Sequence, residues 1–281
     1  MTSERAQLPD LFDMDLPAQR RLIRDGRYNG HTAGLAKGNL QCNLAILPAN
    51  LADEFHTYCR LNPKPCPLAG VSCAGEPAIP RLGADVDIRT DAARYNIYRH
   101  GVLEQQVNDL YAHWRGDLVA FAIGCSFTFE DALRKAGIAM RHIDSNVTVP
   151  MFLSSIETAP SGPFKGGMVV SMRPIPENRI GEVLDICGKF PLAHGAPVHV
   201  GDPSDIGISD LNTPDWGEAV AFEPGEVPVF WACGVTPQAA IMRSKPPLSI
   251  THAPGAMLIT SVSETTGPLY AYNDNQLKYL D

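Results

Sequence analysis

Blocks of apolar and polar residues alternate along the chain and predict short strands and helices. The spacing of apolar residues predicts a helix over Leu16–Arg24 and a strand over Leu40–Leu47. Asn50 is expected to cap a further helix that ends near Arg60. Cys66–Ala92 is rich in proline, glycine and alanine and is predicted to be a long loop. Long loops of this kind are typical of a scaffold whose connections carry the chemistry.

The middle of the chain predicts a hairpin and a β-α-β unit. The sequence predicts two paired strands, Tyr95–Tyr98 and Val102–Val107, with a glycine-containing turn between them. Met168–Met172 predicts a strand, Pro176–Lys189 a helix, and Ala196–Val200 a second strand. Two segments have no regular pattern and are expected to be irregular: His142–Glu157 and Asp202–Glu226.

Two apolar runs lead directly into helices, which is the most informative pattern in the chain. Leu118–Gly124 precedes a predicted helix over Phe129–Ala136, with Thr128 as its expected cap. Val227–Cys233 is followed by a glycine and by a helix that opens at Thr236. Backbone N–H groups at such turns bind small anions in α/β proteins. The two turns indicate an enzyme that acts on a small carboxylate.

Composition excludes several classes of function. The chain has 281 residues and a formal net charge of −8, and it contains no basic run, so nucleic acid is not expected as a partner. Apolar runs of about ten residues are too short to span a bilayer. The amino terminus resembles neither a signal peptide nor a transit peptide, so we expect a cytoplasmic protein without membrane contact.

Cysteine spacing and nucleotide motifs predict neither a metal nor a cofactor. The 7 cysteines are dispersed and form no C-x-x-C pair, which is typical of reduced intracellular thiols. A metal site built from His194, His199, His252 and Asp202 is an alternative, although their spacing matches no known metal motif. Neither nucleotide-binding glycine motif is present. The oligomeric state stays open, with a homodimer as one alternative.

Six motifs that occur in order carry a resemblance to a known family. They are Gly124–Glu130 (GCSFTFE), Arg141–Ile143 (RHI), Ser171–Pro174 (SMRP), His194–His199 (HGAPVH), Phe230–Gln238 (FWACGVTPQ) and Ile250–Gly255 (ITHAPG). The chain resembles the D-glutamate cyclase family over most of its length. Two positions depart from the expected pattern: His31 replaces a proline, and Ser261 replaces an aspartate.

The resemblance implies an α/β fold and a dehydration reaction. The expected fold is a mixed-sheet α/β main domain, residues 1–148 and 229–281, with a smaller inserted two-layer α+β domain, residues 149–228. The implied reaction is the closure of D-glutamate to 5-oxo-D-proline with release of water, catalysed by a hydro-lyase.

Such a cyclisation has four chemical requirements. The amine must be neutral, the γ-carboxyl group must be protonated or polarised, the tetrahedral oxyanion needs donors, and the α-carboxylate must be held. Arg173 is the candidate for holding the α-carboxylate, because a guanidinium binds a carboxylate through two parallel hydrogen bonds. The other candidate substrate-binding residues are hydroxyl side chains at the turns and at a strand end: Ser126, Thr128, Thr236 and Thr251.

The candidate acids, bases and nucleophiles lie in the same motifs. Glu130 is in the first turn of its helix, and burial is expected to raise its pKa into a useful range. His199 and His252, with His194, lie at strand ends or in loops and could transfer protons near neutral pH. Cys125 and Cys233 occupy matching positions, where a helix start is expected to lower a thiol pKa.

Each candidate also has a structural interpretation, and three functions remain open. Arg173 could form an ion pair, the hydroxyl residues could cap helices, and the cysteines could be packed in the core. The leading function is a lyase for a small amino acid or dicarboxylate. The alternatives are a racemase or isomerase that uses Cys125 and Cys233, and a non-catalytic protein that binds small acids.

Overall fold

A seven-stranded sheet forms the larger part of the protein. The computed structural model describes residues 11–145 and 147–266. The strand order is β2-β5-β1-β10-β3-β4, and β11 also pairs with β1. The strands are β1 (Asn39–Pro48), β2 (Leu68–Val71), β3 (Tyr95–Arg99), β4 (Val102–Val107), β5 (Leu118–Gly124), β10 (Ser249–His252) and β11 (Leu258–Ser263). All pairs in this sheet are antiparallel.

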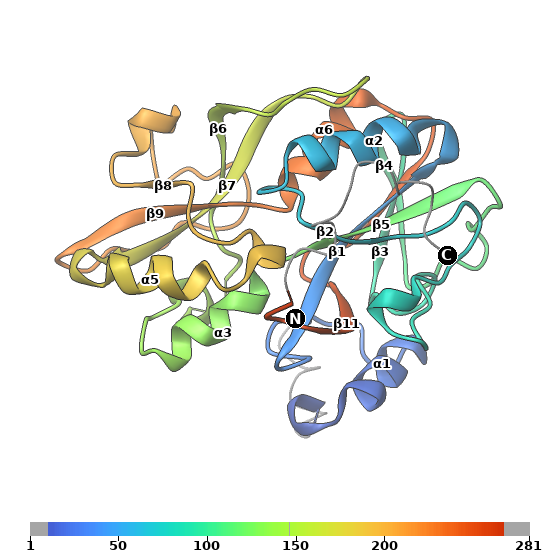
Figure 1. Cartoon of the computed structure of the whole chain (residues 1–281), viewed down its shortest axis with the longest axis horizontal. Helices are drawn as coiled ribbons and strands as arrows, with labels where there is room; N and C mark the ends of the chain where they lie inside the picture. The colour runs from blue at the N-terminus through green and yellow to red at the C-terminus, as the bar shows by residue number, and fades with distance from the viewer. Residues whose placement is uncertain (1–10, 146, 267–281) are drawn as a thin grey trace.

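Helices cover one face of this sheet because its central strands are apolar on both faces. All of β1 after its first residue is buried. The helices α2 (Ala49–Leu61) and α6 (Val235–Ser244) pack on one face through Phe55 and Ile241, which share a core cluster with Phe121 of β5. The other face packs against the loop region around residues 79–92. The helix α1 (Leu16–Arg24) lies at the bottom of Figure 1. We call this unit the main lobe.

A four-stranded antiparallel sheet forms a second lobe, on the left of Figure 1. Its order is β6-β7-β9-β8, with β6 (Met151–Glu157), β7 (Gly167–Pro176), β9 (Glu226–Ala232) and β8 (His199–Val200). The helices α3 (Phe127–Lys135) and α5 (Ile180–Cys187) cover one face of this sheet, where Phe129 and Val183 pack with Trp231. A short helix, α4 (Arg141–Asp144), follows α3. The α/β fold class predicted from the sequence is confirmed. The expected mixed sheet of the main domain was wrong, because every strand pair in the main sheet is antiparallel.

The second lobe is built mainly from the segment expected to be an inserted domain. Its four strands lie between residues 151 and 232, near the predicted limits of 149 and 228. However, α3 belongs by sequence to the predicted main domain and packs on the second sheet. The predicted division into two domains stays a prediction.

Several predicted elements begin or end elsewhere, and two helix caps were wrong. The helix α3 begins at Phe127, so Thr128 lies inside it and Ser126 precedes it. The helix α2 begins at Ala49 after a proline, so Asn50 does not cap it. The hydroxyl of Thr128 instead accepts a hydrogen bond from the N–H of Gln41 in β1.

Segments predicted as loops contain regular structure where a sheet supplies a partner. The predicted long loop contains β2, which pairs with β5, and the 3-10 helix η3 (Pro80–Leu82). The first predicted irregular segment, His142–Glu157, contains most of α4 and all of β6. The second, Asp202–Glu226, contains the whole of the 3-10 helix η6 (Pro203–Ile206). Strand pairing continues β7 as far as Pro176, so the predicted helix there is a 3-10 turn, η4 (Glu177–Arg179), followed by α5. The predicted strand before residue 200 is only the two-residue β8.

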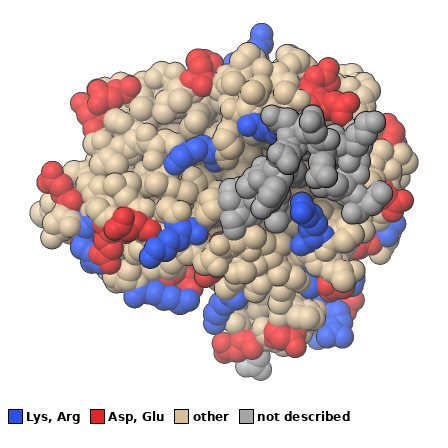
Figure 2. Space-filling view, viewed as in Figure 1, with Lys and Arg blue, Asp and Glu red and all other residues tan. Residues whose placement is uncertain are grey.

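The surface is mixed in charge, and no described helix can span a membrane. On the face drawn in Figure 2, basic and acidic side chains are interspersed over a largely uncharged surface. Within residues 11–145 and 147–266, no helix is both long enough and apolar enough to cross a bilayer.

Candidate functional site

The two strand-to-helix turns lie on either side of one asparagine. Asn43 of β1 donates hydrogen bonds from Nδ2 to the carbonyl oxygens of Gly124 (3.1 Å) and Ile123 (3.3 Å) at the first turn. At the second turn, a Cβ added to Gly234 would lie 2.3 Å from the same Nδ2. Only glycine permits this close approach, which brings the ends of β5 and β9 together.

A buried ion pair joins α3 of this junction to β7. Arg173 of β7 donates from Nε to Oε1 of Glu130 at 3.1 Å, and its Nη2 contacts the same oxygen. Nη1 of the same guanidinium donates to the hydroxyl of Ser171 (3.0 Å), and Nη2 also donates to the hydroxyl of Ser126 (3.2 Å). Every guanidinium nitrogen thus has a partner within the protein.

Aromatic rings enclose this ion pair, which leaves the guanidinium no open side. The guanidinium carbon of Arg173 lies 5.2 Å from the ring centre of Phe129 and 5.1 Å from that of Trp231. The side chains of Arg173 and Glu130 are only 1% and 3% exposed. In this arrangement Arg173 binds an internal carboxylate, whereas the sequence predicted that it would hold the carboxylate of a substrate.

The carboxyl group of Glu130 is held in its ionised form. Burial alone would raise its pKa, but the charge of Arg173 and the nearby His142 outweigh burial and hold the pKa well below its usual value. His142 Nε2 lies 3.2 Å from Oε1 of Glu130. The expectation that burial would raise this pKa was therefore wrong, because the sequence could not show that a guanidinium lies against the carboxylate.

The two cysteines at the turns are protonated thiols at neutral pH. Burial raises the pKa of Cys125 to about 12 and also raises that of Cys233, and the backbone N–H groups of Phe127 and Val235 only partly oppose it. The expected lowering of their pKa by the helix starts was wrong, because desolvation of a thiolate outweighs one N–H contact at each site. This result counts against a racemase that needs a thiolate.

Three of the four candidate hydroxyl groups bind backbone atoms. Thr236 Oγ1 accepts from the N–H of Val169 (3.0 Å) and donates to its carbonyl (3.1 Å), which ties α6 to β7. Thr128 Oγ1 accepts from the N–H of Gln41 (3.3 Å), and Thr251 Oγ1 donates to the carbonyl of the next residue (2.9 Å). The fourth, Ser126, accepts from the guanidinium described above.

His199 lies on the other face of the second sheet from the ion pair. In the β7-β9-β8 register, His199 is opposite Phe230, whereas Arg173 is opposite Val229, one residue along β9. Adjacent residues of a strand point to opposite faces, so the sheet separates His199 from Arg173. The structure therefore does not bring these two candidates together.

Two other histidines are buried and have opposite tautomers. His252 Nδ1 accepts from the N–H of Leu44 (3.1 Å), so its proton is on Nε2. His194 Nδ1 lies 2.8 Å from the carbonyl oxygen of Lys64, which can only accept, so the proton is on Nδ1. Burial lowers the pKa of each to about 4, so both are neutral at pH 7.

A polar pocket of about 360 Å³ opens beside α3, between the two lobes. We call it the α3 pocket. One wall is the glycine-containing segment 33–39, and the other is formed by residues of α3, including the buried Thr128 and Glu130. Charged side chains of both signs line it: Lys37, Glu130, Asp131, Arg134 and Glu264. Its size suits a small amino acid.

Gln41 of β1 also lines this pocket and was not predicted from the sequence. Its Nε2 donates to the carbonyls of Thr32 and Leu35 (both 3.0 Å), which fixes the amide. The buried Oε1 has no hydrogen-bond partner among residues 11–145 and 147–266. The sequence contained a signal for it: Gln41 and Asn43 are polar residues at alternate positions of an apolar strand. Polar groups on one side of a buried strand indicate a polar site.

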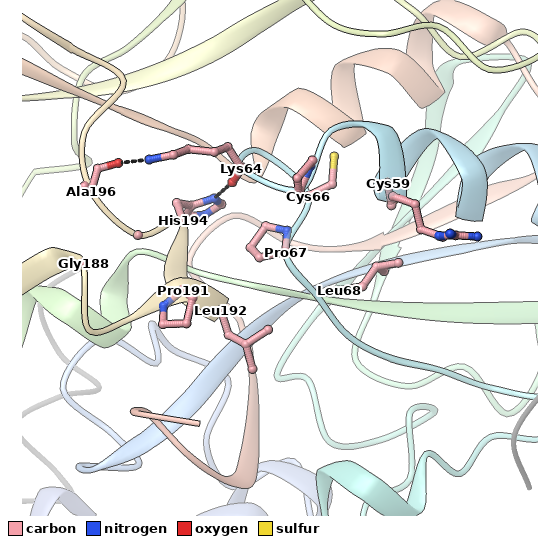
Figure 3. Close-up of a pocket in the computed structure, with 13 residues that line it drawn as sticks. Cys59, Lys64, Cys66, Pro67, Leu68, Gly188, Pro191, Leu192, His194 and Ala196 are labelled. Atoms are coloured by element: carbon pink, nitrogen blue, oxygen red, sulfur yellow. Dashed lines mark hydrogen bonds between the residues drawn. The ribbon is translucent and has the colours of Figure 1, made fainter. Parts of the chain in front are cut away.

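A second, larger cavity of about 630 Å³ lies where the loop after α2 faces the loop after α5. Figure 3 shows His194 and Lys64 in its wall. We call it the interlobe cavity. His252, His199 and Asp202, suggested with His194 as an alternative metal site, form no such group: within the described parts of the chain, no three histidine, cysteine or acidic side chains are placed to hold a metal ion.

Fold and site together define an α/β protein with a pocket between two lobes that is lined by charged side chains of both signs. The model of the D-glutamate cyclase family matches residues 119–261. A relative from Jannaschia sp. is 56% identical over 91% of this chain and 97% of its own length. A relative from Dinoroseobacter shibae is 58% identical over 94% of this chain and 88% of its own length. A relative from Ruegeria pomeroyi is 58% identical over 87% of this chain and 89% of its own length. All three are provisionally named hydro-lyases.

The chain belongs to the D-glutamate cyclase family, as its motifs predicted. Among solved structures, a nitrogen repressor-like protein from Methanococcus jannaschii aligns with 82% of this chain and 89% of its own chain. The TM-score is 0.37 and the sequence identity 8%, a similarity too low to support an argument.

Proposed function

We propose that the protein is a hydro-lyase that removes water from a small amino acid with two carboxylates, with D-glutamate closing to 5-oxo-D-proline as the favoured reaction. The observation that carries the proposal is the α3 pocket, which presents cations, carboxylates and an unpartnered amide oxygen within about 360 Å³. A substrate with two carboxylates and an ammonium group needs charges of both signs around it.

The pocket offers partners for each charged group of such a substrate. Lys37 and Arg134 lie on its walls and suit the two carboxylates. The Oε1 of Gln41 is an unpartnered acceptor, and the amino group of the substrate can donate a hydrogen bond to it. The ionised carboxylate of Glu130 also attracts the substrate's ammonium group. In this scheme Arg173 is a positioning residue, because it fixes Glu130 and does not contact the substrate.

Glu264 is the proposed proton carrier. Burial raises its pKa, the neighbouring Asp131 raises it further, and Lys135 opposes both effects. In the reaction the amine nitrogen forms a bond to the γ-carboxyl carbon, and a C–O bond breaks. Two protons pass from the ammonium nitrogen to the departing oxygen, which leaves as water. A carboxyl group whose pKa is raised above its ordinary value is better suited than an ordinary one to deliver one proton and accept the other.

The test follows loss of 18 mass units, the mass of one water, from D- and L-glutamate and a panel of other amino acids and dicarboxylates. We expect D-glutamate to give 5-oxo-D-proline. Glu264→Gln should lower kcat by about 100-fold or more with little change in KM. Lys37→Met should mainly raise KM. The matched control is Lys165→Met, because Lys165 is exposed and lies outside the pocket.

Glu130→Gln and Arg173→Ala are expected to abolish turnover, and circular dichroism shows whether each variant remains folded. If no substrate in the panel loses water, the proposed reaction is wrong. Exchange of the α-proton with deuterated solvent, without loss of mass, would favour the isomerase. Saturable stabilisation by glutamate without turnover would favour a binding protein.

A further inference from the structure

The interlobe cavity is bounded by two loops that hold each other. The loop after α2 contributes residues 63–68, and the loop after α5 contributes residues 188–196. The carbonyl oxygen of Lys64 accepts the Nδ1 proton of His194, and Nζ of Lys64 donates to the carbonyl of Ala196. Figure 3 shows both contacts on one side of the cavity. Residue 64 therefore joins the two lobes through its main chain and its side chain together.

The first contact leaves an acceptor nitrogen on His194. Because Nδ1 carries the proton, Nε2 has a lone pair, and the imidazole is neutral at pH 7. The residue is 2% exposed and lines the cavity. A ligand in this cavity is therefore expected to offer an N–H or O–H group to Nε2.

The charges of the cavity favour an anion. Lys64 and Arg60 are the charged residues that line it, and both are cations. This local balance is opposite to that of the whole chain, whose formal net charge is −8. Among the described residues that line the cavity, a ligand ammonium group would meet only positive charge, so a hydroxyl group is the better donor for His194.

Most of the remaining wall is apolar and encloses more volume than a small dicarboxylate needs. It is formed by prolines, leucines and thiols: Cys59, Pro63, Cys66, Pro67, Leu68, Pro191 and Leu192. The volume of about 630 Å³ compares with about 360 Å³ for the α3 pocket. An apolar body is therefore expected beside the charged group.

We propose that the interlobe cavity binds a 2-hydroxy acid with an apolar body, its carboxylate at Nζ of Lys64 and its hydroxyl donated to Nε2 of His194. The site is separate from the α3 pocket and does not depend on the reaction proposed there. Because its walls come from both lobes, the bound acid holds the lobes together and raises the thermal stability of the whole chain.

Calorimetric titration with four aromatic probes tests each part of the site. The probes are (R)- and (S)-mandelate, phenylacetate, which lacks the hydroxyl, and 2-phenylethanol, which lacks the carboxylate. We expect one mandelate enantiomer to bind saturably and to raise Tm, phenylacetate to bind about fivefold or more weakly, and 2-phenylethanol to bind about tenfold or more weakly.

Two substitutions separate the hydroxyl contact from the charge contact. His194 has a left-handed backbone (φ 72), which asparagine tolerates, and an asparagine amide can still donate to the carbonyl of Lys64. His194→Asn should therefore weaken mandelate to the level of phenylacetate and leave phenylacetate unchanged. Lys64→Met should weaken both acids, whereas Lys37→Met in the α3 pocket should leave both affinities within about twofold.

Three results would overturn the proposal. They are equal affinities of the wild type for mandelate and phenylacetate, an equal loss of both acids in His194→Asn, and the absence of saturable binding by every probe. Failure of the glutamate reaction would leave these measurements unaffected, so the two proposals can fail separately.

Discussion

Removal of the negative charge of Glu130 is the sharpest test of the junction between the lobes. Arg173 and Glu130 are 1% and 3% exposed, so Glu130→Gln leaves a buried guanidinium without its counter-charge. Breaking a buried ion pair in this way costs about 3–5 kcal/mol. The hydroxyls of Ser126 and Ser171 still accept hydrogen bonds from Arg173, so we expect a loss near the lower end, about 3 kcal/mol.

Urea unfolding of the wild type and of Glu130→Gln at several pH values measures this loss. The matched control is Glu182→Gln, which removes a solvent-exposed ion pair with Arg179 and should lower stability far less than Glu130→Gln does. The double variant Glu130→Gln with Arg173→Met should recover part of the loss, because it no longer buries an unpaired charge.

The pH dependence provides an independent check with a defined sign. The folded-state pKa of Glu130 lies below the ordinary value of 4.5, so its ion pair stabilises the fold fully above about pH 4.5. This contribution is lost as the pH falls through the folded-state pKa. The difference in stability between wild type and Glu130→Gln should therefore shrink below pH 4.5. A loss under about 1 kcal/mol at pH 7, or a difference that does not change with pH, would refute this account.

Two further predictions concern packing at particular positions. Ser261→Asp should change the free energy of unfolding by less than about 1 kcal/mol, because Arg20, which donates from Nη2 to the Ser261 hydroxyl (3.0 Å), already binds the carboxylate of Asp85 through Nε (3.2 Å) and Nη2 (2.7 Å). A larger change in urea unfolding would contradict it. Gly124→Ala should destabilise by about 3 kcal/mol or more, since the new Cβ would lie 1.6 Å from the carbonyl oxygen of Leu192. Gly116→Ala, with no atom within 4 Å, is the control, and equal losses of stability in the two variants would disprove the steric argument.

The position of Ser261 also explains a departure from the family pattern. Ser261 stands where the family pattern has an aspartate. The structure places Ser261 beside Arg20 of α1, in a contact that joins α1 to β11. Arg20 already has the carboxylate of Asp85 as its counter-charge (2.7 Å), so a serine at position 261 leaves no buried charge unpaired.

The order of apolar runs and glycines in the sequence was sufficient to locate the two strand-to-helix turns, because the conformation of such a turn depends on only a few neighbouring residues. Both turns are present, at Gly124 and Gly234. Pattern also singled out Arg173 and Glu130, although it did not show that they bind each other. That pairing depends on where β7 and α3 are placed, which is a property of the packed second lobe.

Electrostatic properties followed from the tertiary structure alone. The pKa of Glu130 and the pKa of Cys125 both move in the direction opposite to that expected, because a neighbouring guanidinium controls the first and desolvation controls the second. Likewise, one residue of register along β9 places His199 on the far face from Arg173. The sequence by itself determined the family, the α/β class and the turns, since these depend on residue type and spacing. Which side chains share a pocket, and in which protonation state, was decided only when distant segments packed together.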